Sequence, residues 1–243
     1  MKSVVIIPAR MAATRFPGKP LVDLCGKPMI QWVYERSSSA TGVSQVIVAT
    51  CDTEIAEAVR AFGGEAVMTS SAHRSGTDRL AEAAAGLDAD VIINVQGDEP
   101  LIDPDSIELA LNPFASRDEV TMTSLMTPID AQSAQNPNLV KVVVDMQNYA
   151  LYFSRSSIPY ERNPMRERPV YGHVGLYAYT RDFLLKFASL QPTPLEQAES
   201  LEQLRVLEYG HRIKMVEIKD RPLGVDTLDD LEKARLAIIN GEL

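Results

Sequence analysis

Short runs of β-branched and aliphatic residues alternate with helical hydrophobic patterns through the first half of the chain. The runs are strand-sized, and they predict strands over Ser3–Ile7, Gln45–Thr50, Glu65–Met68 and Asp90–Val95. The helical patterns between them begin near residues that favour helix N-termini, namely Pro28, Asp52, Ser75 and Asp103. Strands that alternate with helices in this way predict a mostly parallel sheet with helices on both faces.

The second half of the chain has a different order. A polar turn separates two apolar runs, which predicts a hairpin rather than a crossover connection. The predicted strands are Leu139–Val144, Tyr149–Ser154, Val170–Tyr179 and Arg212–Ile218, and helices are predicted over Arg181–Ala188, after Thr193 and after Thr227. The fold class is therefore α/β, with a mixed, mostly parallel central sheet flanked by helices. We predict one domain over residues 1–243, with a β-rich inserted part around 121–190 that could form a dimer surface.

The chain has 243 residues, of which 45% are hydrophobic and 23% are charged, as in ordinary soluble globular proteins. Its 24 basic and 33 acidic residues give a net charge of -9, which disfavours nucleic acid as a partner. Residues 1–19 are the exception, because Lys2, Arg10, Arg15 and Lys19 stand there without any Asp or Glu. This excess of positive charge favours a small polyanion bound at one place.

The sequence gives no sign of a membrane anchor, because no apolar run approaches the ~20 residues that cross a bilayer. Two cysteines, Cys25 and Cys51, are too few for a disulfide framework or a CxxC metal clip. Such cysteine usage is typical of a reducing compartment. We therefore expect a cytoplasmic protein.

The segment 8–20 follows the first predicted strand and carries Arg10, Arg15 and Lys19. Ligands of open α/β sheets bind beyond the carboxyl ends of the strands, where this loop must lie. Its small residues would let backbone N–H groups approach a triphosphate, and its cations can neutralise phosphate oxygens. The alternative is a solvated basic loop. In this segment Gly18-Lys19 is followed by proline instead of Ser or Thr, which disfavours a P-loop ATPase. The GxGxxG motif is also missing, which disfavours a nicotinamide-binding enzyme.

Two aspartates are candidates for a metal site. Asp98 stands on a glycine turn after the buried run 91–95, so its carboxylate is expected to face the same cleft. Asp226 precedes a predicted helix cap and is a plausible second ligand. Mg²⁺ prefers one or two carboxylates together with phosphate oxygens. The alternatives are an ordinary surface turn for Asp98 and an interaction with the helix dipole for Asp226.

Several strings, in order along nearly the whole chain, resemble those of a known family. They are PARMAATRFPGKPL (8–21), SGT (75–77), NVQGDEP (94–100), NPNLVKVV (136–143), YALYFSRSSIP (149–159), GHVGLYAY (172–179), LEQLRVLEYG (201–210) and GVDT (224–227). The chain is similar to the 3-deoxy-manno-octulosonate cytidylyltransferases, or CMP-Kdo synthetases. The resemblance implies a Rossmann-like nucleotide-diphospho-sugar transferase fold and a cytoplasmic homodimer. It also implies Mg²⁺-dependent transfer of CMP from CTP to the anomeric hydroxyl of Kdo, with release of pyrophosphate, for lipopolysaccharide inner-core synthesis.

The same resemblance assigns roles to individual residues. The implied nucleotide-binding residues are Pro8, Ala9, Arg10, Arg15, Lys19, Ser75, Gly76 and Gln96. The implied catalytic residues are Arg10, Lys19, Asp98 and Asp226, with Asp98 and Asp226 as the ligands of Mg²⁺. The implied sugar-binding residues are Gln96, Arg155, His173, Tyr177, Glu202 and Gln203.

Three of the sugar-binding candidates have simpler interpretations. His173 could be a hydrogen-bonded strand residue, Tyr177 could belong to the core, and Glu202 could pair with Arg205 three positions later. The segment 160–171, which borders the sugar site in the family, is shorter here, so the same reaction on the 8-amino analogue of Kdo stays open. More distant alternatives are an enzyme that activates another sugar, such as a sialic acid, and a nucleotide-sugar-binding protein without catalysis.

Overall fold

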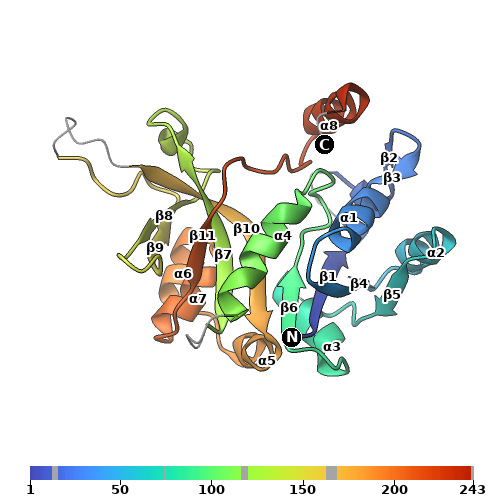
Figure 1. Ribbon diagram of the computed structural model, residues 1–243, viewed down its shortest axis with the longest axis horizontal. Helices are drawn as coiled ribbons and strands as arrows, with labels where there is room; N and C mark the ends of the chain where they lie inside the picture. The colour runs from blue at the N-terminus through green and yellow to red at the C-terminus, as the bar shows by residue number, and fades with distance from the viewer. Residues whose placement is uncertain (13–15, 74, 116–119, 163–168, 242–243) are drawn as a thin grey trace.

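Figure 1 shows a computed structural model of the chain, which describes residues 1–12, 16–73, 75–115, 120–162 and 169–241. The first half of the chain is a parallel sheet with helical crossovers. Its elements are β1 (Ser3–Ala9), β2 (Asp23–Leu24), β3 (Lys27–Pro28), α1 (Met29–Ser38), β4 (Val43–Thr50), α2 (Thr53–Ala61), β5 (Glu65–Met68), α3 (Gly76–Ala85), β6 (Val91–Asn94) and α4 (Pro104–Leu111). β1 pairs in parallel with β4 and with β6, and β4 pairs in parallel with β5. The strands and helices predicted for this half are confirmed.

The second half adds strands beyond β6. Its elements are β7 (Met122–Ile129), β8 (Lys141–Val144), β9 (Ala150–Ser154), β10 (Val170–Thr180), α5 (Arg181–Ser189), α6 (Pro194–Glu199), α7 (Gln203–Glu208), β11 (Lys214–Glu217) and α8 (Leu228–Asn240). β10 runs antiparallel to β6 and β7, whereas β11 runs parallel to β7. The strand order is β11-β7-β10-β6-β1-β4-β5, so the predicted mixed, mostly parallel sheet is confirmed.

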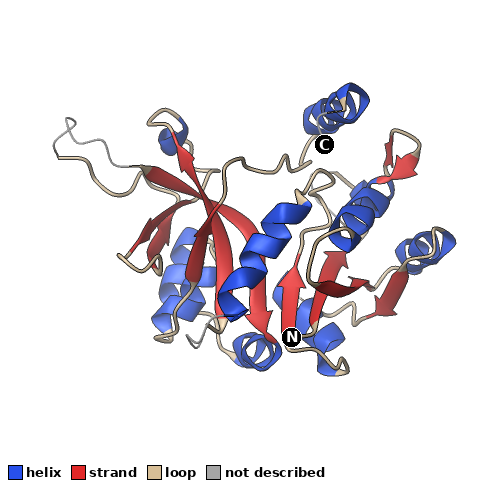
Figure 2. Ribbon diagram, in the orientation of Figure 1, coloured by secondary structure: helices blue, strands red, loops and turns tan. Residues whose placement is uncertain are grey.

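Helices cover both faces of the central sheet (Figure 2). Along β1, Val4 and Ile6 point to one face and Val5 and Ile7 to the other, because successive side chains of a strand alternate. The first pair packs with residues of α3, α5 and α7, and the second pair packs with residues of α1, α2 and α4. All four side chains are fully buried. β1 therefore lies between two hydrophobic cores, which fix the start of the loop that follows it.

The part of the chain around 121–190 supplies four strands, but they have two different places. β7 and β10 lie within the central sheet, between β11 and β6. The hairpin β8–β9 lies off this path and is joined to it where β8 pairs with β10. In Figure 1 the hairpin lies on the opposite side of the molecule from α2. A dimer surface on this part of the chain stays a prediction.

The last helix, α8, belongs to a third and smaller hydrophobic cluster. Its Leu231 and Ala234 pack with Leu24, Met29 and Val225. This cluster holds the segment that leads into α8 against the first half of the chain, which places that segment near the end of β1. No helix within the described ranges is both long and apolar enough to cross a bilayer.

Candidate active site

A cavity of about 380 Å³ opens beyond the carboxyl ends of β1 and β6, and its volume lies in the range of small-molecule sites. It is formed by the loop after β1, the start of α3, the loop after β6 and the segment before α8. Its lining includes Pro8, Ala9, Arg10, Lys19, Ser75, Gly76, Gln96, Asp98 and Asp226. The structure thus brings together every predicted nucleotide-binding, catalytic and metal residue within the described ranges. Arg15 lies outside them.

Lys19 joins three of these segments. Its Nζ atom donates to Asp98 Oδ2 at 2.7 Å, to Asp226 Oδ1 at 3.3 Å and to the carbonyl oxygen of Val225 at 2.8 Å. The side chain of Lys19 is 12% exposed, so this charge is held in a partly dehydrated position. Opposite charges at such distances attract strongly when water is partly excluded. The two carboxylates therefore converge on one point, and a cationic group occupies it.

The loop after β1 is held by backbone contacts. The N–H of Met11 donates to Asp52 Oδ2 at 2.7 Å, and the N–H of Gly18 donates to the carbonyl of Met11 at 3.1 Å. Asp52 stands at the N-cap of α2 but makes no side-chain capping bond there, since its carboxylate is used by Met11. A Cβ atom at Gly97 would lie 3.1 Å from the carbonyl of Pro8. Glycine at position 97 thus permits the two loops to approach closely.

The start of α3 faces the same cavity. Ser75 and Asp78 form the predicted capping box, with the N–H of Asp78 donating to Ser75 Oγ at 3.1 Å. One turn into the helix, the buried guanidinium of Arg79 lines the cavity, donates to Thr69 Oγ1 and lies 3.5 Å from Cys51 Sγ. The sequence prediction missed Arg79, although its spacing of three from Gly76 places it on the same helix face. The helix N-terminus and this guanidinium both favour an anionic ligand.

A second cavity of about 130 Å³ adjoins the first and shares Gly76 and Gln96 with it. It lies between the sheet and the helices α3, α5 and α7. Its other lining residues are Thr77, Asn94, Met122, Tyr177, Tyr179, Phe187, Glu202 and Gln203. Four of the predicted sugar-binding residues, Gln96, Tyr177, Glu202 and Gln203, therefore line one small cavity beside the larger one.

Glu202 makes a specific contact in this second cavity. Its Oε2 atom accepts a hydrogen bond of 2.6 Å from Thr77 Oγ1. Its Oε1 atom is buried and has no hydrogen-bond partner among the described residues, and burial raises the pKa of this carboxyl. Arg205 lies 3.8 Å from Glu202 but donates to Glu196 at 2.7 Å, so Glu196 is its main partner. The simple pairing of Glu202 with Arg205 does not account for the position of Glu202.

His173 lines neither of the two cavities. It is a buried strand residue whose Nε2 atom lies 2.8 Å from Ser124 Oγ, and burial lowers its pKa to about 3. Its ring lies 5.4 Å from that of Tyr177 and 5.0 Å from that of Phe153, measured between centroids. His173 is therefore neutral, and it contacts Tyr177, which lines the second cavity. Burial raises the pKa of the Tyr177 hydroxyl.

Arg155 also lies outside the lining of both cavities. Its Nε atom donates to the carbonyl of Glu199 at 2.8 Å, and its two Nη atoms donate to the carbonyls of Pro137 and Ser200 at 3.2 and 3.4 Å. The N–H of Arg155 donates in turn to the Glu199 carboxylate at 3.0 Å. The guanidinium fork predicted to bind a sugar carboxylate is thus engaged with three backbone carbonyls.

Glu99 is a further group that the sequence prediction missed. Burial and the neighbouring charge of Asp98 raise its pKa to about 8, which is partly offset by Arg221. Its Oε2 atom is buried without a hydrogen-bond partner in the described part of the chain. Two adjacent carboxyl groups thus differ in environment. Asp98 faces the cation of Lys19, and Glu99 is turned away from water.

Comparisons with known proteins identify the family of this chain. The family model described as Cytidylyltransferase matches residues 4–213. A 3-deoxy-manno-octulosonate cytidylyltransferase of Geotalea uraniireducens is 57% identical over 96% of this chain and 97% of its own. A protein of the same name from Geobacter metallireducens is 54% identical over 96% of each chain.

A solved structure extends the likeness to three dimensions. CMP:2-keto-3-deoxy-manno-octonic acid synthetase complexed with CTP superposes on this chain with a TM-score of 0.96. The two sequences are 48% identical, and the match covers 100% of both chains. Because relatives of more than 50% identity span almost the full length, this chain belongs to the family of 3-deoxy-manno-octulosonate cytidylyltransferases.

Proposed function

We propose that this protein transfers CMP from CTP to the anomeric hydroxyl of Kdo, giving CMP-Kdo and pyrophosphate, and that CMP-Kdo serves lipopolysaccharide inner-core synthesis. One observation carries the proposal. Lys19, Asp98 and Asp226 converge in a nucleotide-sized cavity, and this cavity shares Gln96 and Gly76 with a smaller cavity beside it. Two substrates in two adjoining cavities would meet at the shared residues.

The larger cavity suits a nucleoside triphosphate. Arg10 and Lys19 supply positive charge on one side, and Arg79 with the α3 N-terminus supplies it on another. Arg15 would add to this charge. These fixed cations and N–H groups would hold the three phosphates in place and stabilise the charge that grows on the departing pyrophosphate.

Asp98 and Asp226 would hold the magnesium ion. The position of Lys19 supports this assignment, because its ammonium group already places a positive charge between the two carboxylates. It lies 2.7 Å from Asp98 Oδ2 and 3.3 Å from Asp226 Oδ1. Two carboxylates completed by phosphate oxygens match the ligand preference of Mg²⁺. A bound Mg²⁺ would neutralise phosphate charge and favour in-line displacement. No group of three or more His, Cys, Asp or Glu side chains suited to a metal occurs among the described residues, which agrees with a site shared with the substrate.

At the α-phosphorus the reaction forms one bond and breaks one. The anomeric oxygen of the sugar bonds to the α-phosphorus, and the bond between that phosphorus and the oxygen leading to the β-phosphorus breaks. Pyrophosphate takes the electron pair of this bond, and the hydroxyl proton is released. The protein forms no covalent intermediate in this scheme, so Lys19, Arg10 and Gln96 would act by positioning and by charge stabilisation.

The smaller cavity suits the sugar acid, with Tyr177, Glu202 and Gln203 as its polar lining. His173 would act on the sugar through Tyr177. Arg155 could bind the sugar carboxylate if it exchanged its carbonyl partners for that ligand. The 8-amino analogue of Kdo is the second candidate, because the partly buried Glu202 carboxylate could pair with an ammonium group.

The hairpin β8–β9 would form a homodimer interface. Among the described strands β9 pairs with β8 alone; on its other edge the N–H of Ala150 donates to the carbonyl of Ile213 at 2.9 Å, and the rest of that edge has no strand partner. The exposed fractions of Met146, Leu151 and Tyr160 are 97%, 61% and 88%. Exposed apolar groups on and beside a strand edge without a strand partner favour association with another chain. Free Cys25 and Cys51 agree with a reducing compartment, and we infer a cytoplasmic location.

The decisive experiment measures pyrophosphate and CMP-sugar from CTP, Mg²⁺ and either Kdo or its 8-amino analogue in competition. We expect stoichiometric pyrophosphate and CMP-Kdo. Equal turnover with UTP or ATP would contradict the assignment of CTP. If the enzyme prefers the 8-amino analogue, that analogue and not Kdo is the acceptor. Nucleotide binding without turnover would favour a non-catalytic binding protein.

A further inference from the structure

Polar side chains of β6 and β10 form a line that leads to the junction of the two cavities. Asn94 ends β6, and Gln96 follows two positions later, with its Nε2 atom 3.4 Å from Asn94 Oδ1. In the antiparallel pairing, Tyr177 lies opposite Asn94 and Tyr179 lies opposite Ile92. Asn94, Gln96, Tyr177 and Tyr179 all line the smaller cavity.

These side chains are close neighbours. Gln96 Nε2 donates to Asn94 Oδ1 at 3.4 Å. Asn94 also partly offsets the rise in the pKa of the Tyr179 hydroxyl that burial causes. Asn94 is 4% exposed and Tyr179 is 1% exposed, so neither group can turn to bulk water for a partner. The Tyr179 ring is fixed in turn by stacking on Tyr177, with centroids 6.0 Å apart.

The contact with Asn94 determines which end of the Gln96 amide is free. An amide has one donor end and one acceptor end, and here the donor Nε2 is directed at Asn94. Gln96 Oε1 is then the acceptor available where the two cavities meet. A hydrogen-bond acceptor at this place can orient the O–H group of a sugar hydroxyl that approaches the α-phosphorus, whereas the reversed amide would offer a donor instead.

We propose that Asn94, held by Tyr179, is a positioning residue that orients Gln96 so that Oε1 accepts a hydrogen bond from the attacking sugar hydroxyl. This inference rests on the proposed function, because it assumes that a hydroxyl attacks at the junction. Asn94 acts through Gln96 and requires no contact with the substrate. Its loss should therefore reduce the fraction of bound sugar that is correctly aligned for attack, and so reduce kcat more than it changes the KM for CTP.

The test compares wild type with Asn94→Ala, Tyr179→Phe and the conservative Asn94→Asp, which keeps an acceptor for Gln96 Nε2. We expect Asn94→Ala to lower kcat about tenfold, because one buried hydrogen bond is lost. Tyr179→Phe should also have a lower kcat than wild type. Asn94→Asp should recover most of the lost kcat. Because Asn94 acts through Gln96, adding Asn94→Ala to Gln96→Leu should change kcat by less than about twofold.

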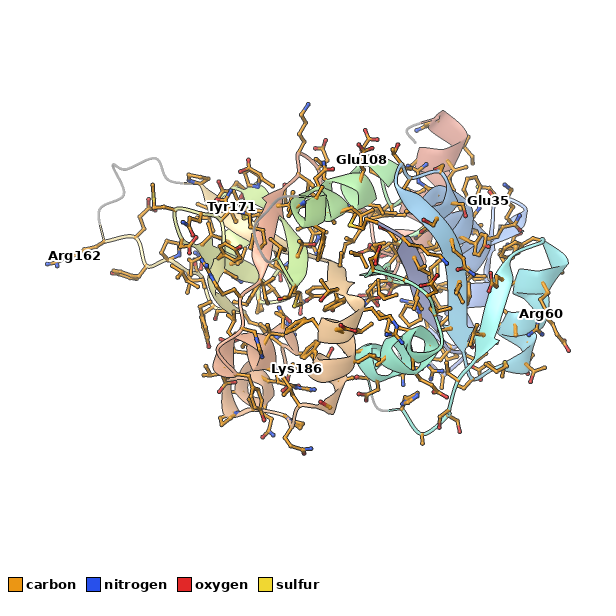
Figure 3. The ribbon with its side chains drawn as sticks, turned by 60° about the horizontal axis from the view of Figure 1, so that its bottom comes forward. Glu35, Arg60, Glu108, Arg162, Tyr171 and Lys186 are labelled. Carbon is orange, nitrogen blue, oxygen red and sulfur yellow. The ribbon has the colours of Figure 1, made fainter. Side chains whose placement is uncertain are left out.

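Tyr171→Phe is the matched control. Tyr171 also lies on β10, and its hydroxyl donates to Glu217 Oε2 at 3.1 Å. It lies in the half of the molecule that carries Arg162, away from the end that carries Arg60 (Figure 3). This variant should keep kcat within about twofold of wild type, because the partly buried Tyr171 lines neither cavity and its ring is retained.

Two results would overturn the inference. One is an unchanged kcat in Asn94→Ala, and the other is an effect of Asn94→Ala that is undiminished in the Gln96→Leu background. If the wild-type chain makes no CMP-sugar at all, the proposed function fails, and a crystal structure of Tyr179→Phe then decides the positioning itself. A rotated Gln96 amide in that structure supports the role of Asn94 and Tyr179, and an unmoved amide contradicts it.

Discussion

The ammonium group of Lys19 lies 2.7 Å from the carboxylate of Asp98, although 79 residues separate the two in sequence. The same ammonium group lies 3.3 Å from Asp226. Without a nucleotide the three charges satisfy one another, and a bound triphosphate would give Lys19 another partner. The carboxylates would then be available to a metal ion. The site is therefore arranged for an exchange of partners when substrate and metal bind together.

Replacing either carboxylate by an amide tests this arrangement. We expect Asp98→Asn and Asp226→Asn each to lower turnover by about 10²- to 10³-fold, because a fixed charge at the phosphates is lost. Pyrophosphate release measures the effect, and circular dichroism checks that the fold is intact. Asp88→Asn is the matched control, since the Asp88 side chain is 99% exposed in a surface ion pair with Lys2. Near-normal turnover in both site variants would remove the metal proposal.

Lys19 should also compete with the metal for the two carboxylates. In Lys19→Met the carboxylates lose their cation, so Mg²⁺ should raise the melting temperature of this variant more than that of wild type. Turnover should fall by about 10²-fold or more, because Lys19 also holds phosphate charge. Thermal unfolding over a series of Mg²⁺ concentrations measures the first effect. Equal Mg²⁺ shifts in the two proteins would contradict a metal site between Asp98 and Asp226.

Sequence patterns were sufficient for the parallel half of the sheet and for the site loops. Buried parallel strands such as β1 read as continuous apolar runs, and the residues after them must lie at one edge of the sheet. This reasoning predicted that Lys19 and Asp98 would lie in one cleft. The resemblance to a known family was needed for Ser75 and Gln96, because short polar segments have many uses in proteins.

Other features depend on contacts between distant segments. Nothing near Arg155 in the sequence indicates that the carbonyls of Pro137, Glu199 and Ser200 meet at its guanidinium. Asp52 has the sequence position of a helix cap, but the loop at Met11 uses its carboxylate. Such partners are selected by tertiary packing, so local propensity cannot predict them.

Arg155 gives a prediction that separates its two roles. We expect Arg155→Ala to lower the free energy of unfolding by about 1 kcal/mol, because the partly exposed carbonyls of Pro137, Glu199 and Ser200 lose a hydrogen-bond donor. If Arg155 also binds the sugar acid, the KM for the sugar acid should rise much more than the KM for CTP. Denaturant unfolding and steady-state kinetics measure the two effects separately. An unchanged KM for the sugar acid would exclude Arg155 from the sugar site and leave it a structural role.

His173 predicts a pH dependence of stability. Burial lowers its pKa to about 3, so below pH 6.5 the unfolded chain binds a proton that the native chain excludes. The contribution of this residue to stability is complete above pH 6.5 and is lost as the pH falls toward 3. Between pH 7 and 5, wild type should lose about 2 kcal/mol more unfolding free energy than His173→Gln. Equal losses in urea unfolding would contradict a buried, neutral His173.

The proposed dimer can be tested at Leu151, which lies on β9 and is 61% exposed in the single chain. If the hairpin is an interface, Leu151→Glu places a carboxylate in an apolar contact, and burying an unpaired charge there is strongly unfavourable. We expect light scattering to give a dimer mass for wild type and a monomer mass for this variant.

Leu109→Glu on α4, at a leucine that is 37% exposed, should stay dimeric as the matched control. A wild-type chain that is monomeric at micromolar concentration, or a Leu151→Glu variant that stays dimeric, would place the interface elsewhere or remove it. If both variants are monomeric, any added surface charge is sufficient to dissociate the dimer, and the result gives no support to the hairpin as the interface.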